Sequence, residues 1–303
     1  MRKLAFALLV VFVMLSITVL PGVGLAAGPD KGESIKPEVW PQPITNPSKA
    51  VPFSHPDEST VNPKSPLYNP KARYGPPGTR FGPPGQRVET TPLGGGRESG
   101  HRWFGTAITT TSNVNYTYAH NNYHSSLSIP SGTTLYAPTL LGTNDSPLEI
   151  LSRYWWDGVT LKREIAVYNH ETTQFEESTS SVSDYLSSGF YAAEILLDSG
   201  TWYAMLYNFD DSQWETWESQ VGGSGPDPYG RGWDVWEEWN FDEGDWPDLG
   251  ETFEAKEILI NIEGSGDAYV TSSHGSEAKD VGSAPYSFAW TSNYYRWYVD
   301  ADR

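Results

Sequence analysis

The sequence predicts an all-β fold for residues 101–303, built as a large antiparallel β-sandwich or barrel. Its segments are short, rich in Thr, Tyr, Val, Ile and Trp, and often alternate between apolar and polar residues. Gly, Asn, Asp, Ser or Pro interrupts them about every eight to twelve residues, and no stretch keeps a helical apolar spacing over three turns. We therefore expect roughly eleven to thirteen strands in two packed antiparallel sheets, one of them concave.

The expected strands follow one another at short intervals. They cover residues 102–118, 124–130, 133–141, 148–156, 162–170, 190–197, 201–209, 255–263, 267–273, 286–292 and 294–300. The stretch WDVWEEWNFDEGDW, which begins at Trp233, predicts a further strand that enters a loop. In a strand Trp236 faces away from both Trp233 and Trp239, because side chains alternate between faces, so at least one of the three belongs to the core.

The start of the chain predicts export. Residues 1–27 combine a basic start, an apolar run to about Leu20, and small residues near Ala26 that suit cleavage, as a secretory signal does. An uncleaved membrane anchor is the alternative, because the apolar run approaches spanning length. No later stretch is apolar for long enough to cross a bilayer, so we expect a secreted or extracellular protein without membrane insertion after cleavage.

Residues 28–100 predict a Pro/Gly-rich segment that is extended or disordered when alone. Proline is dense and apolar periodicity is absent, so the segment buries too little surface to offset its chain entropy. Its stretch YGPPGTRFGPPGQR contains a short repeat, residues 74–80 and 81–87. The segment is either a spacer or an intramolecular pro-segment that lies on the domain and blocks its site.

Charge separates this segment from the domain that follows. Residues 28–100 hold nine Lys/Arg and seven Asp/Glu, whereas residues 101–303 hold nine and thirty-one, a net charge of −22. Such a field repels nucleic acid and anionic membranes, so neither is an expected partner. The chain has no cysteine, which excludes disulfides, thiolate catalysis and cysteine-dependent zinc sites.

The sequence also lacks the motifs of several enzyme classes. There is no phosphate-binding glycine loop before a helix, no HExxH and no GxSxG. His120 and His124 lie in YAHNNYHSS, which is typical of a turn, so we expect no metal site and no cofactor. Carboxylates beside aromatic rings remain, because a carboxyl held against tryptophan gains a raised pKa and suits acid–base chemistry.

Three segments resemble the glutamic peptidases, or eqolisins. They are EILSRYWWDG at 149–158, ILLDSGTWYAMLYNFDDSQWETW at 195–217 and EWNFDEGDWPDLGETFEAKEILI at 238–260. The resemblance implies a concanavalin A-like sandwich, or jelly roll, made as a secreted acid endopeptidase with a removable pro-segment. In that family a Gln and a Glu on the concave sheet activate water to hydrolyse peptide bonds.

The resemblance carries those two positions onto Ser152 and Asp242. Both are substitutions, since serine lacks the carboxamide and aspartate is one methylene shorter than glutamate. Glu149 lies on the strand of Ser152, but their odd separation predicts that the two face opposite ways. Glu238 and Asp242 share a strand face, so they form a candidate carboxyl dyad, and a facing-strand glutamate is an alternative partner for Glu238. The facing-strand candidates are Glu164 and Glu194.

Two other functions stay open from the sequence. A carbohydrate-binding module on the same sandwich would need no catalytic residue, because tryptophan faces stack on sugars. Its candidate stacking residues are Trp155, Trp156, Trp236 and Trp239. A structural cell-surface protein would use the Pro-rich segment as a stalk and carry glycans at Asn115 and Asn144. For a peptidase or a carbohydrate-binding module, the expected partner is an extended polymer, a peptide or a glycan.

Overall fold

The computed structural model describes residues 40–53, 101–110, 113–131, 133–156, 159–227, 229–240, 247–281, 285–290 and 293–302. For His101, Trp239, Asn240 and Asp280 it describes the backbone alone. The predicted signal segment, residues 1–27, lies outside these ranges, as does most of the predicted linker. Within these ranges, none of the helices has the length and apolar character needed to cross a membrane.

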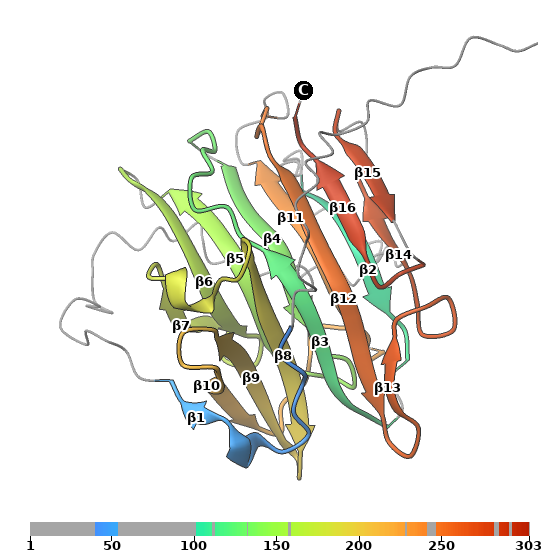
Figure 1. Cartoon of the computed structure of the whole chain (residues 1–303). Helices are drawn as coiled ribbons and strands as arrows, with labels where there is room; N and C mark the ends of the chain where they lie inside the picture. The colour runs from blue at the N-terminus through green and yellow to red at the C-terminus, as the bar shows by residue number, and fades with distance from the viewer. Residues whose placement is uncertain are drawn as a thin grey trace, which may run out of the picture. The chain divides into compact units, whose positions relative to one another are not determined.

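The domain is a two-sheet sandwich, as the sequence predicted (Figure 1). Sheet A pairs its strands in the order β1 (Val51–Pro52), β10 (Gln213–Val221), β9 (Thr201–Asn208), β8 (Phe190–Asp198), β3 (Val114–Asn122), β12 (Thr252–Ile262), β16 (Trp297–Asp300) and β15 (Ser287–Trp290). One further strand, β13 (Gly266–Tyr269), also pairs with β12. The described pairs of sheet A are antiparallel except β1 with β10.

Sheet B lies behind sheet A in Figure 1 and is antiparallel throughout its described pairs. Its order is β14 (Gly275–Asp280), β2 (His101–Ile108), β11 (Gly232–Asn240), β4 (Thr133–Leu141), β5 (Leu148–Trp156), β6 (Leu161–Asn169) and β7 (Gln174–Thr179). The only helical elements among the described residues are two 3₁₀ turns, η1 (Pro47–Lys49) and η3 (Ser183–Tyr185).

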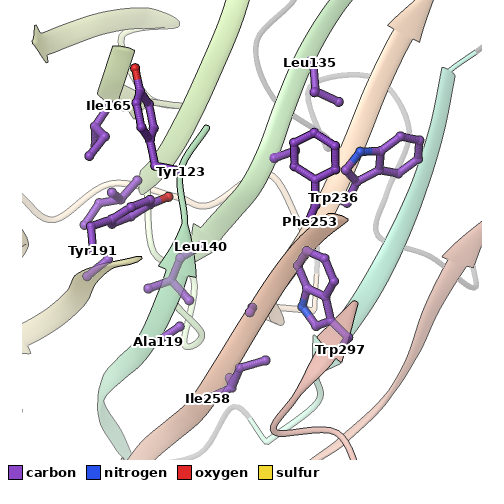
Figure 2. Close-up of a cluster of buried hydrophobic side chains, with 14 of the residues drawn as sticks. Ala119, Tyr123, Leu135, Leu140, Ile165, Tyr191, Trp236, Phe253, Ile258 and Trp297 are labelled. Atoms are coloured by element: carbon purple, nitrogen blue, oxygen red, sulfur yellow. The ribbon is translucent and has the colours of Figure 1, made fainter. Parts of the chain in front are cut away.

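The main core fills the space between the two sheets (Figure 2). Sheet B contributes side chains such as Leu135 and Trp236, and sheet A contributes Tyr191, Phe253 and Trp297. Because strand side chains alternate, each core residue sets the direction of its neighbours along the strand. On β11, for example, the core position of Trp236 turns residues 235 and 237 to the outer face of sheet B, the face directed away from sheet A.

Both outer faces are also well packed. The outer face of sheet A holds an apolar cluster that includes Tyr116, Tyr118 and Trp214, against which Ile44 and Ala50 pack. Residues 40–53 therefore belong to the same compact unit as the sandwich, although they fall inside the segment predicted as linker or pro-segment. Their strand β1 extends the edge of sheet A at β10.

Strand prediction was correct for most of the sheet and wrong at a few places. The strands predicted at 133–141 and 148–156 match β4 and β5 at both ends. Residues 124–130 form a loop, because Leu127 and Ile129 reach the core without sheet pairing and their carbonyls accept side-chain hydrogen bonds instead. The single strand predicted at 102–118 is divided into β2 and β3, which lie in different sheets.

Candidate functional site

Two of the predicted catalytic residues, Ser152 and Glu149, lie on strand β5 and point to opposite faces of sheet B. Ser152 points into the core, is fully buried, and its hydroxyl donates to the Tyr191 hydroxyl at 3.1 Å. Glu149 points to the outer face of sheet B, as its odd separation from Ser152 predicted. Ser152 therefore serves the packing between the sheets and cannot meet a ligand on the outer face.

Glu238 also faces the interior. It lies on β11 two residues after Trp236 and so points to the same face. It has no exposed surface, and its Oε2 lies 3.2 Å from the Tyr286 hydroxyl. The prediction that Glu238 faces a substrate groove is therefore wrong for this structure, because the core position of Trp236 fixes its direction. Glu164 lies on the outer face of sheet B and Glu194 on that of sheet A, so neither faces Glu238. Asp242 lies outside the described residues.

The four predicted stacking tryptophans do not form one platform. Trp236 is fully buried in the core, and Trp156 packs against that core and donates to the Ile129 carbonyl at 3.0 Å. Trp155 lies on the outer face of sheet B, where the Arg153 guanidinium covers its ring at 4.1 Å. The side chain of Trp239 lies outside the described part of the structure.

A row of polar side chains crosses the outer face of sheet B. Glu237 on β11 is in register with Tyr136 on β4, and Tyr136 is in register with Arg153 on β5. Arg153 is in turn in register with Glu164 on β6. We call these four residues the outer-face row. A carboxylate, a phenol and a guanidinium thus occupy adjacent strands at about 5 Å spacing, which is the ordinary distance between strands.

Three members of the outer-face row are buried despite their position, and Glu164 is partly buried. The exposed fraction is 0% for Glu237, 2% for Tyr136 and 7% for Arg153. Burial raises the pKa of Tyr136 above its usual value; the positive charge of Arg153 opposes this, and the charges of Glu237, Tyr168 and Glu149 add to it. Tyr136 therefore keeps its proton and remains a hydrogen-bond donor at acid and neutral pH.

Arg153 is held in a fixed position by three neighbours. Its NH1 donates to Glu164 Oε1 at 3.1 Å, and its guanidinium lies over the rings of Phe175, at 3.9 Å, and Trp155. The Trp155 indole donates to the same Glu164 oxygen at 3.0 Å. A guanidinium held by a carboxylate and stacked on two rings needs little further ordering when it binds an anionic or polarised oxygen.

Glu149 forms a second polar cluster on this face. Its Oε1 accepts hydrogen bonds from the Thr139 hydroxyl and, at 2.9 Å, from the Trp233 indole, while Oε2 lies 2.9 Å from His170 Nε2. Glu149 has no exposed surface. With three partners on its two oxygens, this carboxylate is suited to hold other groups in place more than to take a proton from water.

The sequence reasoning did not identify Glu237, Tyr136, Arg153 or His170 as site residues. The sequence did hold information that could have identified Glu237. If Trp236 is placed in the core, the alternation of side chains along a strand directs Glu237 to the outer face. The lateral neighbours Tyr136 and Arg153 depend on strand order, which the residues alone did not provide. Among the described residues no three His, Asp or Glu side chains form a cluster suited to a metal ion.

Comparison with known proteins gives distant structural matches only. No protein-family model matches the chain, and no curated protein does. A solved structure of scytalido-glutamic peptidase with a peptide-based transition-state analogue matches 67% of this chain and 98% of its own, with a TM-score of 0.42 and 13% identity. The eqolisin SCP-B, in complex with the tripeptide Ala-Ile-His, gives the same coverage and TM-score at 14% identity.

A module of another kind also appears among the matches. The CBM2 module of the Lactobacillus casei BL23 phage J-1 evolved Dit matches 45% of this chain and 69% of its own, with a TM-score of 0.26 and 14% identity. The comparison thus returns the peptidase family that the sequence resembles, at a distance. The chemistry of the candidate site rests on this chain's own residues.

Proposed function

We propose that this chain is a secreted, acid-adapted endopeptidase whose active face is the outer face of sheet B. The observation that carries the proposal is the register of Glu237, Tyr136 and Arg153 on three adjacent strands. These three residues supply one carboxylate and two hydrogen-bond donors, which are the groups that water-mediated hydrolysis of an amide requires.

Each member of the row has a role in this mechanism. Glu237 takes a proton from water as the water oxygen attacks the peptide carbonyl, and later gives that proton to the leaving amine. Arg153 and the Tyr136 hydroxyl donate to the oxyanion that develops on the carbonyl oxygen. Glu164 and the Phe175 ring hold Arg153 in place before substrate arrives.

The proposed activity needs this face to be uncovered, since Glu237 has no exposed surface. The part of the predicted pro-segment after Phe53, residues 54–100, is the proposed cover, because it holds six Lys/Arg and four Asp/Glu while residues 101–303 carry a net charge of −22. Protonation in acid lowers that negative charge, which weakens both the attraction to a basic segment and the domain's self-repulsion. Cleavage of the segment in acid is therefore the proposed activation step.

A lectin-like function has less support. Of its four predicted stacking residues, two are committed to the core and Trp155 is covered by Arg153. Flat, exposed tryptophan faces are what sugar stacking requires. The outer-face row, by contrast, brings together acid–base and oxyanion-binding groups that a binding module does not need.

Hydrolysis of a denatured protein from pH 2 to 7 tests the proposal. We expect the secreted chain, with residues before His101 cleaved where necessary, to show acid-optimal cleavage that Glu237→Gln lowers at least about a hundredfold. Tyr136→Phe should lower it by about tenfold or more, because one oxyanion donor is lost. The control Glu254→Gln, on the outer side of sheet A, should leave it unchanged.

Two results would remove the peptidase proposal. One is a folded, fully processed wild-type chain that cleaves nothing across the pH range. The other is a Glu237→Gln variant that cleaves as fast as the wild type.

A further inference from the structure

The outer face of sheet A has features of a second binding surface. Its floor is largely aromatic, with Tyr116, Tyr118 and Trp214 buried and with Tyr203, Tyr207 and Phe209 packed against them. Most of these side chains come from β3, β8, β9 and β10, which pair with one another in that order. The backbone pairing of these four strands to one another therefore does not depend on β1. The N-terminal segment, residues 40–53, lies on this floor from Trp40 to Ala50 and then continues along the edge of sheet A as β1.

Side chains of the floor bind the N-terminal segment largely through the main-chain atoms of the segment. The Tyr118 hydroxyl donates to the Pro41 carbonyl at 2.7 Å, and the Trp214 indole donates to the Gln42 carbonyl at 3.0 Å. The Ile44 amide donates to Glu194 Oε2 at 3.0 Å. Contacts of this kind recognise an extended backbone whatever its side chains are, as peptide-binding surfaces do.

An aromatic residue anchors each end of the segment. At the start, the Trp40 ring packs on His120 with centroids 4.1 Å apart, and Lys256 Nζ lies 4.5 Å from the Trp40 ring. At the far end, past the β10 edge of sheet A, the Phe53 ring stacks on Trp217 of the core between the sheets, with centroids 4.4 Å apart. Aromatic anchors in pockets give such a surface its specificity.

Strand addition completes the contact at the Phe53 end. Val51 pairs with Glu215 in the parallel β1–β10 ladder, and the Phe53 amide donates to the Thr216 carbonyl at 2.9 Å. The prolines of the segment, at positions 41, 43, 47 and 52, restrict its backbone before binding and so reduce the entropy that docking costs.

One buried carboxyl group under the segment is only partly satisfied by it. Glu194 is fully buried at the centre of the sheet, and within the described part of the chain its Oε1 accepts no hydrogen bond. Buried carboxylate oxygens nearly always have a partner, so this oxygen has acceptor capacity that the present segment does not use. His120 Nδ1 beside the Trp40 ring is likewise buried without a hydrogen-bond partner.

We infer that the outer face of sheet A, together with its β10 edge, is a binding surface for an extended, proline-containing peptide with an aromatic residue at each end, and that residues 40–53 occupy it in cis. The inference does not depend on the peptidase proposal, because that site lies on the other sheet. One consequence concerns the stretch between Phe53 and His101, whose two ends both lie on the sandwich. Cutting that stretch would leave the N-terminal segment bound through non-covalent contacts alone.

The test uses the full chain with a site-specific protease sequence placed between Phe53 and His101. After cleavage, we expect the N-terminal fragment to stay with the domain in size-exclusion chromatography. A labelled synthetic peptide of residues 40–53 should then displace it in a saturable way, as measured by fluorescence anisotropy. The same peptide with Trp40→Ala and Phe53→Ala should not bind.

A matched pair of domain variants makes the readout specific. Trp214→Phe keeps the ring but loses the donor to the Gln42 carbonyl, so the affinity for the labelled peptide should fall about fivefold. Trp156→Phe, on sheet B, should leave the affinity unchanged. The inference is overturned if the fragment leaves and the labelled peptide does not bind. It is equally overturned if loss of the fragment unfolds the domain by near-ultraviolet circular dichroism, because the segment is then part of the core.

Discussion

Trp233 and Glu149 meet across a strand that separates them in sheet B. The indole Nε1 on β11 donates to the carboxylate on β5 at 2.9 Å, while β4 lies between the two strands. Both side chains are almost fully buried, and the same carboxylate also bonds Thr139 and His170. This contact ties together three strands of the face that carries the outer-face row.

Trp233→Phe should therefore destabilise the domain through the loss of one donor to a buried carboxylate. We expect a loss of about 2 kcal/mol in the free energy of unfolding, because hydrogen bonds to charged groups are worth about 1.5–3 kcal/mol. Urea unfolding monitored by circular dichroism measures it. The control Trp156→Phe removes an indole bond to a neutral carbonyl and should cost less; the opposite order would contradict the role assigned to Glu149.

Asp234 should make the fold more stable in acid. Burial raises the pKa of Asp234 to about 8, opposed by the neighbouring Asn121 amide and by the hydrogen bond from the Trp297 indole, and assisted by the charge of Glu149. Between its ordinary pKa and about 8 the folded state holds the proton that the unfolded state releases, so stability falls as pH rises through this window. The loss amounts to several kcal/mol, since each pKa unit corresponds to about 1.4 kcal/mol.

Asp234→Asn isolates this effect. The amide cannot ionise and keeps an oxygen for the Trp297 indole, so the variant should lose much of the decline in stability between pH 4 and 8. Urea unfolding at pH 4, 6 and 8 measures the slope. An identical decline in the variant and the wild type would show that Asp234 is not its source.

His120 should remain neutral in acid. Burial, together with the positive charge of Lys256, lowers the pKa of His120 to about 3. Its imidazole NMR shifts should therefore stay constant from pH 7 to 4. Because the unfolded histidine gains a proton near pH 6.5, His120 costs stability as pH falls from there towards 3, opposite in sign to Asp234.

Lys256→Met tests the assigned cause. Removing the charge should raise the pKa of His120 while leaving the larger effect of burial, so titration should begin at higher pH than in the wild type. A pKa that stays where it was would show that burial alone sets it.

Gly105 should tolerate no side chain. Its φ is +155°, and a Cβ there would lie 2.3 Å from the Asp234 carbonyl and 2.7 Å from the Val235 Cα on the paired strand. Gly105→Ala should push β2 away from β11 and lower the melting temperature strongly or prevent folding. Gly200→Ala is the control for backbone conformation, since that glycine also has positive φ but has open space around its Cβ.

The sequence predicted the fold class because strand alternation and turn residues are local signals. It placed β4 and β5 at their observed ends, and the odd spacing of Glu149 and Ser152 correctly put them on opposite faces. It failed at residues 124–130, where Leu127 and Ile129 are buried from a loop. A short apolar run reports burial, and burial does not require sheet pairing.

What the sequence determined by itself is thus the all-β class, many of the strands with their alternation, and the proline-rich character of the chain before His101. Tertiary structure decided which face is interior, and so made Glu237, not Glu238, a member of the outer face. It also decided which strands are neighbours, and so joined Glu237 to Tyr136 and Arg153, and seated residues 40–53 on sheet A. The physical reason is that alternation is a property of one strand, whereas lateral register and the covering of a face are set by contacts between residues far apart in the chain.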